Sequence, residues 1–307
     1  MKKYIFGFLL LLLITFGIYM FKKPIPIDEL KAKYTDDYSN FISINGLKVH
    51  YKKKGQGTPI LLIHGTSSSL QTWEAWEDQL SQQFTCYSID MPGGGLTTPP
   101  ADDNYAIATY REFIDSFVIK LQIDSFYLAG NSLGGHIAWD YAANSILNDR
   151  VKKLILLDPS GFFDPTRPKP LIFQLAQSDL LFNLIEHLNT KAFVIKSLKE
   201  VFYNDDLITE KTISQYADLN LRKGNRKAFF LKVRQIETGD KQDLKKIACP
   251  TLILWGENDL WIPLKLADIF TANVPNNQLI VYPECGHIPM EELPEESVQD
   301  AIHFLEQ

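Results

Sequence analysis

Short apolar runs alternate with longer amphipathic stretches through most of the chain. Runs of strand length occur at Ile60–Ile63, Cys86–Ile89, Phe126–Ala129, Leu154–Leu157, Leu252–Trp255 and Leu279–Tyr282. Helical spacing of apolar residues occurs between or after them, at Trp73–Leu80, Ala108–Leu121, Leu133–Ala143, Leu264–Phe270 and Ser297–Leu305. Continuous apolar strands separated by helices are typical of a parallel sheet covered on both faces. The pattern therefore predicts an α/β fold with a mostly parallel central sheet.

A hairpin is expected just before this alternation begins. Apolar residues between Phe41 and Tyr51 flank the pair Asn45-Gly46, which is the strongest short-range signal of a two-residue hairpin turn. We take Phe41 as the start of the globular core.

One stretch interrupts the alternation of strands and helices. Between residues 162 and 242 no run is typical of a buried strand, and Leu, Ile and Phe recur at three- and four-residue intervals. These residues form either ordinary amphipathic core helices or a helical cap inserted over an apolar pocket. We interpret the segment as a cap, which divides the core into residues 41–161 and 243–307.

The N-terminus carries the longest uncharged run. Lys2 and Lys3 precede 18 residues without charge, 4–21, which would span about 27 Å as a helix, close to the roughly 30 Å of a bilayer core. A cleaved signal peptide typically has a shorter apolar region and a small-residue cleavage motif. We therefore interpret residues 1–23 as a single-pass membrane anchor and the polar residues 24–40 as a linker. Lysines flank both ends of the run, but the free N-terminal amine together with Lys2 and Lys3 slightly favours a cytoplasmic N-terminus, with the globular core on the extracytoplasmic side.

The composition of the chain excludes several classes of function. The chain has 307 residues, of which 45% are hydrophobic and 22% charged, as in ordinary globular proteins. A net charge of −6 gives no basic field for nucleic acid. Cys86, Cys249 and Cys285 lie far apart and show no C-x-x-C spacing. We therefore expect neither a disulfide framework nor a metal site.

The stretch Gly130-Asn131-Ser132-Leu133-Gly134 joins a predicted strand to a predicted helix. The pattern G-x-S-x-G is weak by itself, but a strand before it and a helix after it strengthen it. Such an elbow holds the serine in a strained conformation with its hydroxyl exposed, and the glycines leave room for the close turn. The alternative is an ordinary strand-to-helix turn. We interpret Ser132 as a nucleophile.

A serine hydroxyl needs a general base to become an effective nucleophile. His287 follows the last predicted strand, and Asp259 follows the strand before it. The chain order Ser, Asp, His is the order that elbow enzymes of this kind require. We predict His287 as the base and Asp259 as its acid partner. Asp158 also follows a strand and is the reserve candidate for the acid.

The developing oxyanion needs hydrogen-bond donors. In this architecture they are the backbone N–H after the nucleophile, here Leu133, and one from the loop after an early strand, here Thr66. His64 lies at the end of that strand and is interpreted as structural, because a base at this position would break the required chain order.

These motifs together resemble the α/β-hydrolase superfamily over residues 41–307. The matching segments are His64-Gly65, Asp90-Met91-Pro92-Gly93, the Gly130–Gly135 elbow, Gly256-Glu257-Asn258-Asp259 and Gly286-His287. The stretches "SIDMPGGGLTTPP" and "GHIPMEELPEE" are similar to membrane-bound monoacylglycerol lipases of that group. Two departures are Thr97, where the family usually has serine, and Gly94, where a larger residue is common. The resemblance implies the α/β-hydrolase fold with an inserted cap, a Ser-His-Asp triad and no cofactor.

We expect a serine hydrolase acting on carboxylic esters, with lipid-like or medium-chain acyl esters such as monoacylglycerol as its substrates. Ser132 argues against dehalogenases and epoxide hydrolases of the fold, which use aspartate. Carbon–carbon bond hydrolases of ring-fission products share G-N-S-x-G-G, but usually have a glycine-rich loop where this chain has Thr66-Ser67-Ser68-Ser69. A proline iminopeptidase would need acidic cap residues, for which Glu186, Glu200, Asp205 and Asp206 are available. An inactive scaffold of the same fold is the non-enzymatic alternative.

Overall fold

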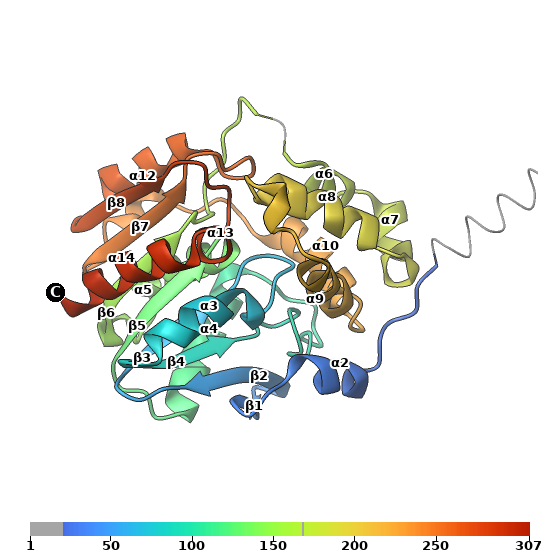
Figure 1. The fold of residues 1–307 in the computed structure, drawn as a ribbon, viewed down its shortest axis with the longest axis horizontal. Helices are drawn as coiled ribbons and strands as arrows, with labels where there is room; N and C mark the ends of the chain where they lie inside the picture. Colours follow the sequence, from blue (N-terminus) through green and yellow to red (C-terminus); the bar gives the residue numbers. More distant parts are fainter. Residues whose placement is uncertain (1–20, 168) are drawn as a thin grey trace, which may run out of the picture.

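A computed structural model of the chain describes residues 21–167 and 169–307, and these form an eight-stranded sheet in the order β1-β2-β4-β3-β5-β6-β7-β8 (Figure 1). The strands are β1 (Ser39–Ile44), β2 (Leu47–Lys54), β3 (Thr58–Ile63), β4 (Phe84–Ile89), β5 (Phe126–Asn131), β6 (Val151–Leu157), β7 (Thr251–Gly256) and β8 (Asn277–Tyr282). β2 pairs antiparallel with both β1 and β4. The remaining neighbours, in the order β4-β3-β5-β6-β7-β8, pair in parallel. The predicted, mostly parallel sheet is confirmed.

Helices cover both faces of the sheet. One face carries α3 (Glu74–Leu80) and α14 (Pro294–Glu306), and the other carries α4 (Ile107–Lys120), α5 (Leu133–Asn144) and α12 (Ala267–Asn273). In β7, Leu252 and Leu254 pack on the α14 side, whereas Ile253 and Trp255 pack on the α12 side. All four side chains are fully buried. Because alternate residues of a strand face opposite sides, a strand covered on both faces is apolar throughout.

The hairpin between β1 and β2 has the predicted two-residue turn. Ile44 pairs with Leu47, so that Asn45 and Gly46 form the turn, with φ of 48° and 79°. Asparagine and glycine tolerate this left-handed conformation, which matches the twist of the two strands.

Residues 24–40, expected to be a linker, contain the helix α2 (Ile27–Tyr34). Its Leu30 is buried against Leu96 and Leu219. Ile27 and Tyr34 pack in the same cluster and share one helical face with Leu30, but three apolar positions over eight residues are a weak signal in the sequence.

The expected membrane anchor requires a correction. Residues 1–20 lie outside the described residues, and Phe21–Lys23, the described end of the expected anchor, are not helical. Phe21 instead forms a β-bridge with Leu188. Across residues 21–167 and 169–307 no helix is long and apolar enough to cross a bilayer. The longest, α4, has 14 residues, against about 20 needed. The predicted transmembrane helix, and the single-pass localisation with an extracytoplasmic domain that depended on it, are therefore withdrawn.

A helical segment separates β6 from β7. It contains α6 (Leu171–Leu175), α7 (Asp179–Leu184), α8 (Lys191–Val201), α9 (Glu210–Asn220), α10 (Asn225–Gln235) and α11 (Lys241–Leu244). The helices α6 to α10 gather together at one side of the sheet (Figure 1). They face the carboxyl ends of β5 and β7, where the candidate catalytic residues lie.

Candidate active site

Ser132 lies at a sharp elbow between β5 and α5. Its φ of 56° and ψ of −119° are a strained combination for a residue other than glycine. A Cβ at Gly130 would lie 2.2 Å from the carbonyl oxygen of Gly134, and one at Gly134 would lie 2.1 Å from that of Ile63. Both contacts are impossible for a side chain. The glycines therefore permit the close turn that sets Ser132 on the wall of a cavity.

His287 and Asp259 form a buried hydrogen-bonded pair. His287 Nδ1 lies 2.6 Å from Asp259 Oδ2, and both residues are 3% exposed. The other oxygen, Asp259 Oδ1, accepts the backbone N–H groups of Trp261 and Ile262 at 2.7 and 2.9 Å. His287 Nε2 has no hydrogen-bond partner among the described residues, and His287 lines the same cavity as Ser132. An imidazole so held presents Nε2 as a proton acceptor.

The loop that carries His287 is held in place by residues that the sequence did not point to. Asn131 Nδ2 donates to the carbonyl of His287 at 3.0 Å, and the N–H of His287 donates to the carbonyl of Val201, in α8, at 2.7 Å. Glu292 accepts the backbone N–H of Gly286 at 2.7 Å. Asn131 occupies the variable position of G-x-S-x-G, so the motif carried no signal for this role.

Two backbone N–H groups are free near Ser132. Thr66 and Leu133 donate to no acceptor among the described residues. A Cβ placed on Gly65 would lie 3.0 Å from the Cβ of Ser132, so the loop that carries Thr66 runs directly beside the serine. Thr66 and Leu133 are therefore the candidate donors of an oxyanion hole beside Ser132.

Asp158, the reserve candidate for the acid, lies beside the pair rather than within it. Its Oδ1 accepts the N–H of Gly256 at 2.9 Å, and Oδ2 has no partner among the described residues. Burial and the neighbouring Asp259 carboxylate raise the pKa of Asp158 well above its usual range. Two buried carboxyl groups in contact cannot both ionise, and Asp259 is the one that binds His287. Of the two carboxyl groups, Asp158 is therefore the one whose charged form is disfavoured.

Two other histidines, His64 and His136, are buried and are not placed to act as an acid or a base. His64 Nδ1 lies 2.8 Å from the carbonyl of Gly65, and Nε2 accepts the N–H of Met91 at 3.0 Å. Burial lowers the pKa of His64 to about 4. Burial also lowers the pKa of His136 to about 3. Both side chains are neutral near pH 7.

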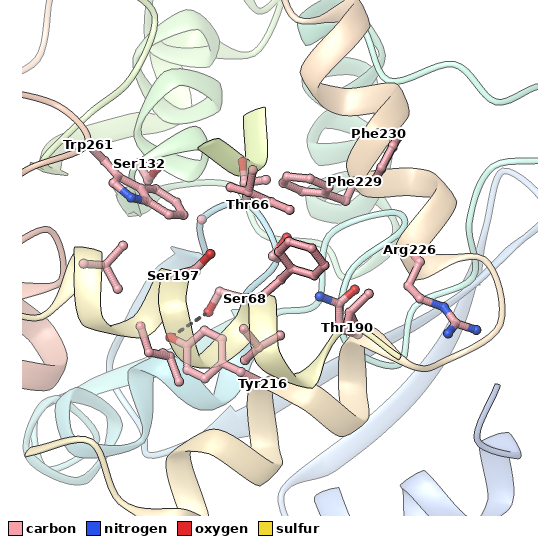
Figure 2. A pocket seen from close by; sticks show the side chains of 18 of the residues that line it. Thr66, Ser68, Ser132, Thr190, Ser197, Tyr216, Arg226, Phe229, Phe230 and Trp261 are labelled. Carbon is pink, nitrogen blue, oxygen red and sulfur yellow. Dashed lines mark hydrogen bonds between the residues drawn. The ribbon is translucent and has the colours of Figure 1, made fainter. Parts of the chain in front are cut away.

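The cavity in front of Ser132 has an empty volume of about 1040 Å³, part of it open to solvent. Its size is in the usual range for small-molecule sites. Most of its wall is apolar and comes from the segment between β6 and β7: Ile172, Leu175, Leu181, Ile185, Leu188, Phe193, Val194, Leu198, Val201, Phe229 and Phe230. Figure 2 shows Ser132 and Trp261 at one side of this cavity and Thr190 and Arg226 at the opposite side.

The acidic residues of the helical segment have other partners. Glu186 accepts the backbone N–H of Lys227 at 3.0 Å, and Glu200 accepts the indole N–H of Trp261 at 3.1 Å. Asp205 pairs with Lys199 at 2.6 Å. These three carboxylates and Asp206 do not line the cavity.

The donor atoms of Asp158, Asp259 and His287 lie within 4.8 Å of one another, close enough for a metal ion. Their chemistry does not suit one. His287 and Asp259 are already joined by a hydrogen bond, and burial disfavours the charged form of Asp158 that a metal ion would need. The arrangement instead suits a base supported by one carboxylate.

The family described as alpha/beta hydrolase fold matches residues 58–294. The cis-3-alkyl-4-alkyloxetan-2-one decarboxylase of Shewanella oneidensis is 27% identical, over 87% of this chain and 87% of its own. The monoacylglycerol lipase abhd6-A of Xenopus laevis is also 27% identical, over 82% of this chain and 77% of its own. A crystal structure of a membrane phospholipase A, described as a bacterial virulence factor, superposes with a TM-score of 0.76 at 26% identity, over 100% of this chain and 98% of the other.

Proposed function

The chain belongs to the alpha/beta hydrolase fold family and is a hydrolase of that family, and from this premise we propose that it cleaves carboxylic esters through a Ser132–His287–Asp259 triad. The observation that carries the proposal is the position of Ser132. It lies at a strained elbow, in the same cavity as the free Nε2 of a histidine that is bound to a buried carboxylate. The names of the similar proteins span several reactions, so the residues of the site rather than the likeness support the reaction class.

In the first half-reaction, Ser132 Oγ attacks the ester carbonyl carbon while its proton passes to His287 Nε2. The carbonyl oxygen becomes an oxyanion, which the N–H groups of Thr66 and Leu133 stabilise. Asp259 stabilises the imidazolium and holds its orientation. The bond to the alcohol oxygen then breaks, and the alcohol leaves with the proton from His287. The product is an acyl-enzyme on Ser132.

In the second half-reaction, water attacks the acyl carbon and gives its proton to His287 Nε2. The bond to Ser132 Oγ breaks, and the proton returns from His287 to the serine. A carboxylic acid is released and the free enzyme is regenerated. The step needs no cofactor, because His287 supplies the base and water is the second substrate.

We propose residues 162–242 as a cap that provides most of the substrate pocket, between core segments 41–161 and 243–307. Its apolar wall suits an acyl chain, which supports lipid-like or medium-chain esters as substrates. Monoacylglycerol is an ester of this kind and is the named substrate class of one relative. The occupied carboxylates of the cap give little support to a peptidase that must bind a free amine.

A fluorophosphonate probe tests the nucleophile directly. We expect one label on the purified chain, located at Ser132 by peptide mass spectrometry. Ser132→Ala should abolish both labelling and ester hydrolysis while the circular dichroism spectrum stays unchanged. Failure to label a well-folded sample would contradict the proposal and favour the inactive scaffold. Strong turnover of a ring-fission diketone with little turnover of any ester would favour the carbon–carbon bond hydrolase instead.

A further inference from the structure

Thr190 precedes helix α8 at its N-cap but does not cap it. Its hydroxyl accepts no hydrogen bond from the first turn, and its φ of −94° and ψ of 1° are outside the extended region that capping residues adopt. Ser178 and Thr209, at the N-caps of α7 and α9, have extended backbones and accept from Leu181 and Thr212. The helical segment therefore uses capping hydroxyls elsewhere, and the conformation of Thr190 prevents it here.

The Thr190 hydroxyl is also without any other partner. The residue is 8% exposed, it lines the cavity, and its Oγ1 makes no hydrogen bond to any described residue. A buried hydroxyl without a partner is unfavourable, and such groups are rare unless something occupies the site. Figure 2 shows Thr190 at the cavity wall on the side opposite Ser132.

Asn220 provides a second free polar group on the cavity wall. It is the last residue of α9, it lines the cavity, and its side-chain amide has no hydrogen-bond partner among the described residues. Thr190 lies at the N-cap of α8 and Asn220 at the C-terminal end of α9, and both line the same cavity.

The neighbouring Arg226 is already engaged. Its Nη1 donates to the carbonyls of Lys22 and Leu188, and its Nη2 donates to that of Glu186. Its Nε has no partner among the described residues, but Figure 2 shows the guanidinium turned away from Thr190. The free groups that remain on the cavity wall are a neutral hydroxyl and a neutral amide. Such groups can pair with an uncharged oxygen, whereas a carboxylate or phosphate buried here would also need a charged partner to offset the loss of its hydration.

Building on the proposed function, we propose that Thr190 and Asn220 form a polar subsite that binds a second, uncharged oxygen of the ester substrate, distant from the scissile bond. A plain alkyl chain beside these groups would displace water and leave both groups unpaired. The substrate class is therefore an oxygenated ester, with a hydroxyl or ether oxygen on either its acyl or its alcohol part.

Matched substrate pairs locate that oxygen. On the acyl side, p-nitrophenyl 8-hydroxyoctanoate is compared with p-nitrophenyl nonanoate, and on the alcohol side 2-hydroxyethyl octanoate is compared with propyl octanoate. Each pair exchanges one hydroxyl for one methyl group. Thr190→Val, which keeps the shape and removes the hydroxyl, should lower the hydroxylated-to-alkyl ratio of kcat/KM about five-fold for one pair, the value of one hydrogen bond. The pair that responds identifies the side of the ester that enters the subsite.

Two controls separate the subsite from folding effects. Thr58→Val, at an exposed position on β3 outside the cavity, should leave both ratios unchanged. Thr209→Val removes a real cap bond and should lower the Tm by about 3 °C. Thr190→Val should not lower the Tm, because no cap bond is lost. Asn220→Leu should act on the same pair as Thr190→Val.

A binding measurement makes the subsite testable without turnover. In Ser132→Ala, tryptophan fluorescence is titrated with 1,8-octanediol and with 1-nonanol, since Trp261 lines the cavity. The diol should lose about five-fold in affinity relative to the alkanol when Thr190→Val is added. Active enzyme with unchanged ratios for both pairs would overturn the subsite and leave the ester hydrolase standing. No hydrolysis of any ester would overturn the hydrolase proposal, and the diol titration would then decide the subsite alone.

Discussion

His287 Nδ1 lies 2.6 Å from Asp259 Oδ2, while the second oxygen of Asp259 is held by the N–H groups of Trp261 and Ile262. Three hydrogen bonds thus hold this carboxylate in one orientation. An acid so placed can fix the tautomer of the histidine and stabilise the imidazolium that forms during attack.

The first prediction follows from this pair. Asp259→Asn should lower kcat for ester hydrolysis by about 10³- to 10⁴-fold, because the amide favours the wrong histidine tautomer and carries no charge. Asp158→Asn should change kcat less than ten-fold, because Asp158 does not bind His287 and burial already disfavours its charged form, which an amide of similar shape replaces. Steady-state kinetics of the two variants provide the check. If kcat fell strongly in Asp158→Asn and stayed nearly normal in Asp259→Asn, the acid would have been assigned to the wrong residue.

The second prediction concerns acyl length. Each methylene buried against the apolar wall contributes about 0.8 kcal/mol, so kcat/KM for p-nitrophenyl esters should rise by up to about four-fold per methylene from acetyl to medium chains. The rise should stop when the cavity is filled. If kcat/KM were highest for the acetyl ester and no higher for the octanoyl ester, lipid-like substrates would be contradicted. The assignment as a hydrolase would be unaffected.

The third prediction concerns stability and pH. Glu291 accepts hydrogen bonds from Thr72 of the core and Tyr216 of α9, and burial raises its pKa to about 7. The folded state therefore holds the proton more tightly than the unfolded chain, whose pKa is near 4.5. This contribution to stability is complete below about pH 4.5 and is lost as the pH rises towards 7, by up to about 3 kcal/mol.

Urea unfolding at pH 5 and at pH 7.5 measures this loss. In Glu291→Gln, which keeps an oxygen for Tyr216 and cannot ionise, the free energy of unfolding should fall less between the two pH values than in the wild type. If the free energy of unfolding depended on pH equally in both proteins, Glu291 would not be the source of that dependence.

The fourth prediction concerns the elbow. Gly134→Ala would place a methyl group 2.1 Å from the backbone oxygen of Ile63, so β3 or the elbow must shift. Fluorophosphonate labelling of Ser132 should fall at least about ten-fold, and the Tm should fall as well. Gly46→Ala is the matched control, because its methyl group meets nothing within 4 Å and only its positive φ costs stability, about 1 kcal/mol. Normal labelling of Gly134→Ala would show that the elbow tolerates the side chain.

The sequence by itself determined the elements of the core and their order. Continuous apolar runs of strand length predicted the strands of the doubly covered sheet, and apolar residues at a period of 3.6 predicted its helices. The same local signals marked Asn45-Gly46 as a turn and Gly130–Gly134 as an elbow. Ser132, Asp259 and His287 could be singled out because each follows its own strand at the same edge of the sheet.

Only the tertiary structure decided how these residues are held and what surrounds them. Asn131 supports a carbonyl 156 residues away, and Tyr216 meets Glu291 across 75. No local pattern encodes partners so distant in sequence. The same limit applies to α2, whose Leu30 is buried against Leu96 and Leu219, and to Asp158, whose pKa depends on its burial and on the carboxylate beside it. The free hydroxyl of Thr190 likewise exists because the folded backbone turns it away from its own helix and into the cavity.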